Sequence, residues 1–161
     1  MAGGRKYIKN SLWLIVPPIL ILAIVSPLPL AYRTAVFWKD IPGWVSLGES
    51  LTRTILVVWP AFMPFRIASR TQRTGLTLYI LGLAAYWAAW QVPGWLLPSS
   101  AWSTSALAFM APAWTPAIWL VDIALMNEQM YFWVRYRRWM YLAVACVFLS
   151  FHNYHAWVVW T

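Results

Sequence analysis

Long uncharged stretches separated by short basic segments dominate the pattern of this chain. The longest runs from residue 74 to residue 121 without a charged side chain. A helix needs about 20 apolar residues to cross the hydrocarbon core of a membrane, so this stretch is long enough for two helices. Residues 93–105 contain Pro, Gly and Ser and mark the break between them. We therefore predict helices over residues 74–97 and 102–126.

The flanking sequence predicts three further helices. Residues 12–32 carry no charge but contain four prolines, so we expect this helix to be kinked or partly broken. Residues 44–65 include Glu49 and Arg53, and this segment crosses a membrane only if that turn lies in the interface or pairs within the bundle. Residues 139–160 form the last apolar segment. The predicted fold is an all-α integral membrane protein, with about five transmembrane helices in a single domain over residues 1–161.

The composition also indicates that the chain is embedded in a lipid membrane. The 161 residues are 62% hydrophobic and 10% charged, whereas soluble domains have about 25% charged residues. A chain this short could not bury so much apolar surface in water. Its one cysteine, Cys146, excludes an internal disulfide and a cysteine-based metal cluster.

The charges indicate an orientation. With 12 basic and 4 acidic residues the net charge is +8, which in a soluble protein would suggest nucleic acid. Here basic residues concentrate in alternate connections, as cytoplasmic loops of membrane proteins require, whereas the other loops hold only Arg33 and Lys39. We expect a cytoplasmic N-terminus, an outer C-terminus, a bacterial-type inner membrane and no nucleic-acid partner. The predicted cytoplasmic anchors after the leader are Arg66, Arg70, Arg73, Arg135, Arg137 and Arg138.

Four polar side chains in the outer half of the predicted bundle are candidates for function. Glu49 and Arg53 are four residues apart, and His152 and His155 are three apart, so each pair shares one helix face. Glu49 and Arg53 can neutralise each other near the interface; alternatively, Arg53 binds an anionic group such as a lipid phosphate while Glu49 holds it in place. The histidines either form interfacial hydrogen bonds or ligate a metal or haem with residues from other helices, such as Glu49 or Asp40. The sequence assigns no metal and no cofactor.

Tryptophans fall into two groups. Most lie near predicted membrane boundaries, which suit a ring that is apolar but carries an N–H donor. A deeper group needs another explanation, and we regard its members as candidates for contact with a ligand. They are Trp59, Trp87, Trp114 and Trp119. Small residues on the third predicted helix, including Gly82 and Ala89, predict close packing between helices.

In size, predicted helix number and tryptophan content, the chain resembles the tryptophan-rich sensory protein (translocator) family. Residues 112–126 are its nearest approach to that family's proline- and tryptophan-containing segments. The resemblance implies a helix bundle that binds tetrapyrroles and sterols. It is one of general features, and no functional residue is carried over from it.

These features favour a function without catalysis. The chain contains no glycine-rich phosphate loop, no Gly-x-Ser-x-Gly elbow and no His-Glu-x-x-His motif. The leading hypothesis is an accessory or structural subunit that packs with other membrane subunits or with copies of itself. The alternatives are a binder or transporter of a tetrapyrrole, sterol or lipid, and an outer-leaflet lipid-modifying enzyme that uses the four polar residues.

Overall fold

The computed structural model describes residues 9–24, 28, 30–96, 98–133 and 135–161. All named elements in this part of the chain are helical. They are η1 (Ser11–Leu14), α2 (Val16–Ile24), η2 (Leu30–Tyr32), α3 (Thr34–Phe37), α4 (Gly43–Val58), η3 (Trp59–Phe62), α5 (Arg70–Gln91), the π-helical turn η4 (Val92–Leu96), α6 (Ala106–Trp114), α7 (Pro116–Met126) and α8 (Arg138–Trp160). The predicted all-α class is therefore confirmed for the described residues.

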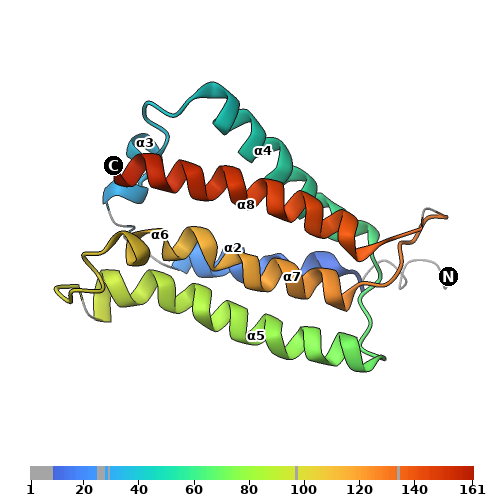
Figure 1. The fold of residues 1–161 in the computed structure, drawn as a ribbon. Helices are drawn as coiled ribbons and strands as arrows, with labels where there is room; N and C mark the ends of the chain where they lie inside the picture. Colours follow the sequence, from blue (N-terminus) through green and yellow to red (C-terminus); the bar gives the residue numbers. More distant parts are fainter. Residues whose placement is uncertain (1–8, 25–27, 29, 97, 134) are drawn as a thin grey trace.

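The long helices lie side by side and alternate in direction (Figure 1). α6 and α7 follow one another along nearly one line, with the break at Thr115 next to Pro116. α5 packs against α7, and α8 packs against α4, α6 and α7. The core between them contains Leu56, Tyr79, Ile123 and Tyr141.

Proline and capping residues move several predicted boundaries. α4 ends at Val58 rather than at residue 65 because Pro60 follows, and a proline lacks the amide donor that continues a helix. α5 begins at Arg70 rather than at residue 74 because Ser69 and Gln72 form a capping box. The helix predicted over residues 12–32 is divided into η1, α2 and η2; its residues 25–27 and 29 lie outside the described residues. The last helix, α8, matches its prediction within one residue at its start.

Two helical stretches, Ala106–Met126 and Arg138–Trp160, are long and apolar enough to cross a membrane. α4 has 16 residues, about 24 Å at 1.5 Å per residue, whereas a hydrocarbon core is about 30 Å thick. α5 has 22 residues, but its Thr, Tyr, Trp, Gln and Gly residues lower its mean hydropathy. Five complete spans are therefore not confirmed.

The basic connections meet at one end of the bundle. The backbone amide of Phe65 donates to the carbonyl of Lys9, and that of Tyr131 donates to the carbonyl of Phe62, both at 2.9 Å. Glu128 accepts from Ser69 and Arg138, each at 3.1 Å. These contacts join the start of the described chain to residues 59–69 and 127–137. All six predicted anchors, Arg66, Arg70, Arg73, Arg135, Arg137 and Arg138, belong to these connections or to the adjoining helix starts.

Glycine allows α5 to approach α7 closely. A Cβ at Gly82 would lie 2.9 Å from Cγ2 of Ile118 and 3.1 Å from the backbone nitrogen of Trp119. Gly75 and Ala89, each seven residues from Gly82, are buried on the same side of the helix. The predicted small-residue packing is thus present, and it involves the glycines as much as the alanines.

We expect Gly82→Ala to lower the free energy of unfolding by about 1–3 kcal/mol, because the new methyl group meets backbone as well as side chain. Gly43→Ala is the matched control, since no atom lies within 4 Å of a Cβ at that position. Thermal unfolding of the two variants in the same mild detergent measures the difference. Equal stability of the two would contradict the close packing of α5 on α7.

Candidate functional site

The carboxylate of Glu49 is the centre of a buried polar cluster between α4 and α8. Its Oε1 lies 3.0 Å from Nδ1 of His152, and its Oε2 lies 2.6 Å from Nδ1 of His155. Glu49 and His155 are fully buried, and His152 is about four-fifths buried. The structure thus brings together the two pairs that the sequence places on separate helices.

Arg53 completes this cluster from one turn further along α4. Its guanidinium donates to Oε1 of Glu49, as the spacing of four residues within a helix allows. The side chain of Arg53 is 44% exposed, and its guanidinium carbon lies 5.7 Å from the centre of the Trp38 ring. Glu49 therefore accepts from three donors, while Arg53 keeps most of its donors available.

Local packing explains how α4 comes close enough to α8. Gly48 precedes Glu49, and a Cβ at this position would clash with the ring of Phe151 on α8. Absence of a side chain at Gly48 therefore permits the contact on which the Glu49–histidine bonds depend. Trp44 packs on Phe151 and Tyr154 one turn earlier along α4.

His155 lies between two acceptors. Its Nε2 lies 2.7 Å from the carbonyl oxygen of Phe37, and its Nδ1 faces the Glu49 carboxylate. The Phe37 ring stacks on the imidazole at 4.1 Å, and Trp38 meets it edge-on at 4.5 Å. His155 therefore fastens α3 and the turn after it to the α4–α8 pair.

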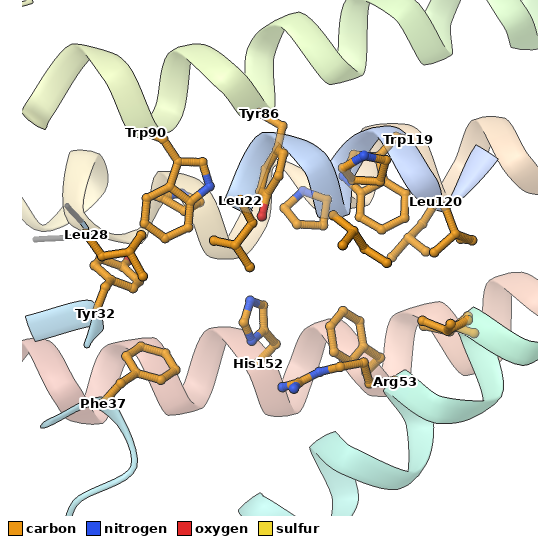
Figure 2. Close-up of a pocket in the computed structure, with 18 of the residues that line it drawn as sticks. Leu22, Leu28, Tyr32, Phe37, Arg53, Tyr86, Trp90, Trp119, Leu120 and His152 are labelled. Atoms are coloured by element: carbon orange, nitrogen blue, oxygen red, sulfur yellow. The ribbon is translucent and has the colours of Figure 1, made fainter. Parts of the chain in front are cut away.

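A cavity of about 330 Å³ borders this cluster. Side chains from α2, α4, α5, α7 and α8 surround it, and most are apolar (Figure 2). Arg53 and His152 provide charge and hydrogen-bonding capacity on one side, and Figure 2 shows both facing the same space as Leu22, Tyr86 and Trp119. An apolar chamber with a few convergent polar groups is the usual form of a small-molecule site.

The four deep tryptophans have different surroundings. Only Trp119 lines the cavity. Trp87 and Trp114 are 45% and 42% exposed and do not contribute to its wall. Trp59 packs edge-on against Tyr141 in the core. The four tryptophans were grouped by their depth along the predicted helices, but depth does not determine which side of a helix a residue occupies. For this reason the four side chains do not line one common cavity.

Other aromatic residues take the place of those tryptophans at the cavity. Tyr32, Phe37, Trp38, Tyr86 and Trp90 all line it. Tyr86 and Trp90 are four residues apart on α5, a spacing that places them on one face. That spacing was a usable signal for this pair, whereas nothing in the sequence indicates that residues 32–38 fold back onto the same space.

Asp122 is a buried carboxyl group outside the cluster. It lies on α7, and its Oδ2 has no hydrogen-bond partner among the described residues. No ion pair joins Asp122 to Arg66, Arg70 or Arg135 in the described chain.

The histidine pair does not form a metal centre in the described residues. No group of three or more His, Cys, Asp or Glu side chains there is arranged to hold a metal ion. The Nδ1 atoms of both histidines instead point at the oxygens of Glu49. The arrangement is a hydrogen-bonded ionic cluster.

We expect Glu49→Gln to destabilise the fold by about 3–5 kcal/mol, because it removes the one negative charge that faces a guanidinium and two imidazoles. Glu128→Gln is the matched control. Glu128 pairs with Arg138 at the surface, so its loss should cost less than about 1 kcal/mol. Thermal unfolding in detergent compares them, and a Glu49→Gln protein as stable as the control would contradict a central role for this carboxylate.

Comparisons with known proteins identify no family for this chain. The chain matches no protein-family model, no curated protein and no solved structure. The general resemblance to the tryptophan-rich sensory family is thus not accompanied by a sequence or structural match. The properties of the site follow from the geometry of its own residues.

Proposed function

We propose that the chain is a multi-pass membrane protein that holds an apolar or amphipathic small molecule in the cavity between α2, α4, α5, α7 and α8. The cavity itself is the observation that carries this proposal. Its volume of about 330 Å³ is at the lower end of the range of about 300–1,000 Å³ that small-molecule sites occupy. Tetrapyrroles, sterols and lipids are the classes to compare.

The distribution of charge supports the multi-pass part of the proposal. Alternating helices place the connections that carry Arg66, Arg70, Arg73, Arg135, Arg137 and Arg138 at one end. α3 lies near the C-terminus at the other end (Figure 1). Basic residues favour the cytoplasmic side, so the basic end would face the cytoplasm and the C-terminus the outside. α4 would then cross as a short helix whose Glu49 charge is neutralised within the bundle.

Catalysis is the second candidate, and one observation favours it. Glu49 holds Nδ1 of His152, while the same imidazole borders the cavity. A carboxylate that orients a histidine in this way is found in general-base catalysis. A lipid-modifying enzyme would use His152 as the base, with its reacting group supplied by the bound molecule or by water. The accessory-subunit hypothesis remains a prediction from composition.

Filling the cavity should weaken ligand binding. We expect Leu22→Trp to weaken binding about tenfold or more, since the indole occupies space that a ligand needs. Leu47→Trp is the control, because Leu47 is exposed on α4 and lies outside the cavity wall. Tryptophan fluorescence of protein in neutral lipid nanodiscs, titrated with a porphyrin, a sterol and single-chain lipids, measures affinity. No response to any of these in the unmodified protein would overturn the proposal.

The orientation has its own test. In a Cys146→Ala background, Thr104→Cys should react with a membrane-impermeant maleimide on intact cells, because residues 98–105 would lie outside. Gln129→Cys should react only after permeabilisation, because it lies in the basic connection after α7. The reverse pattern, or labelling of both on intact cells, would contradict the orientation.

A further inference from the structure

The polar side of the cavity carries an excess of positive charge. Arg53 contacts Oε1 of Glu49, and the Nδ1 atoms of His152 and His155 face the two oxygens of this carboxyl group. The Phe37 carbonyl can only accept, so Nε2 of His155 donates to it, and a further proton lies between Nδ1 of His155 and Oε2 of Glu49. Glu49 and His155 together are then neutral, whichever of them holds that proton. Arg53 adds one positive charge, so the cluster has a net positive charge even with His152 neutral.

No other carboxylate compensates this excess in the described chain. The protein has four acidic residues. Glu128 pairs with Arg138, and no ion pair among the described residues joins Asp40 or Asp122 to the cluster. Uncompensated charge within an apolar bundle is costly. An anionic group in the cavity would relieve that cost.

Arg53 has the geometry to receive such a group. Its contact with Glu49 uses one terminal nitrogen, and the planar guanidinium has five N–H donors in all. Arg53 and His152 both line the cavity, and no hydrogen bond engages the second ring nitrogen of His152 in the described chain. Two oxygens of one headgroup could therefore bind the guanidinium as a bidentate pair, with His152 beside them.

The rest of the wall suits an aliphatic chain. Leu22, Trp119 and Leu120 lie across the cavity from Arg53 (Figure 2), and Pro116 also lines it. Leu22 and Ile19 of α2 line it while remaining partly exposed, so the cavity reaches the side of the bundle that would face lipid. Its small volume favours one chain over the two chains of an ordinary membrane lipid.

We propose that the ligand is a single-chain amphiphile with an anionic headgroup, a carboxylate or a phosphate, bound by Arg53 and His152, with its chain along Leu22 and Trp119. This rests on the proposed function of the cavity and names the class of molecule it takes. Glu49 is a positioning residue, which fixes Arg53 and His152 without contacting the ligand.

Probes with one chain and different headgroups test this proposal. Protein in phosphatidylcholine nanodiscs is titrated with dodecanoate, dodecyl phosphate and dodecanol, with empty nanodiscs as the blank for partitioning. We expect at least one anionic probe to bind about tenfold or more tightly than dodecanol, as charge-assisted hydrogen bonds predict. Preference between dodecanoate and dodecyl phosphate distinguishes a fatty acid from a lysophospholipid-like source.

Substitution of Arg53 localises the effect. Arg53→Gln should reduce binding of the anionic probes to the level of dodecanol and leave dodecanol unchanged. Arg73→Gln is the control, since Arg73 lies at the opposite end of α5 from the cavity residue Trp90. If Arg53→Gln does not fold, Arg53→Lys is the second variant. It keeps the positive charge but lacks the planar guanidinium, so it should still bind the anionic probes more weakly.

The outcomes separate the two proposals. Equal affinity for all three probes, or an anion preference that survives in the Arg53 variant, would overturn the anionic-headgroup proposal while the cavity remained a binder. No binding of dodecanol or of either anion would overturn the anionic-headgroup proposal, and the same failure with the porphyrin and the sterol would overturn the proposed function as well.

Discussion

The carboxylate of Glu49 is the charge around which α3, α4 and α8 are organised. It accepts from Arg53 within α4 and from two histidines of α8, and through His155 it holds the backbone at Phe37. A buried charge is tolerable only when it is paired and hydrogen-bonded. Glu49 meets this requirement with partners from a neighbouring helix. The packing of α4 against α8 therefore also provides the hydrogen bonds that the buried carboxyl group needs.

The cavity depends on how the helices pack. Gly48 brings α4 onto Phe151, and Gly82 brings α5 onto α7, so the helices approach most closely at small residues. Prolines on α2 and at the α6–α7 break contribute to the wall, where a regular helix would present a fuller surface. The apolar space lies beside charges that the bundle has already oriented, an arrangement suited to an amphipathic ligand.

Charge also separates the two ends of the molecule. The basic connections are joined by backbone hydrogen bonds at one end, and the Glu49 cluster contacts α3, which lies near the C-terminus at the other end. In the proposed orientation, the arginines would lie at the cytoplasmic headgroups and the cluster would lie in the outer half of the membrane. Orientation and ligand recognition would then depend on different basic residues.

Sequence alone determined the helical class, the break at residues 93–105, the extent of α8 and the separation of basic from neutral connections. It also placed Glu49 with Arg53, and His152 with His155, because spacing of three or four residues fixes a shared helix face. Tertiary structure decided which faces meet. The rotation of each helix about its axis depends on packing at residues such as Gly48 and Gly82, which carry no chemical signal of their own. For that reason only Trp119 of the four deep tryptophans reaches the cavity, while Tyr86, Trp90 and the folded-back residues 32–38 form much of its wall.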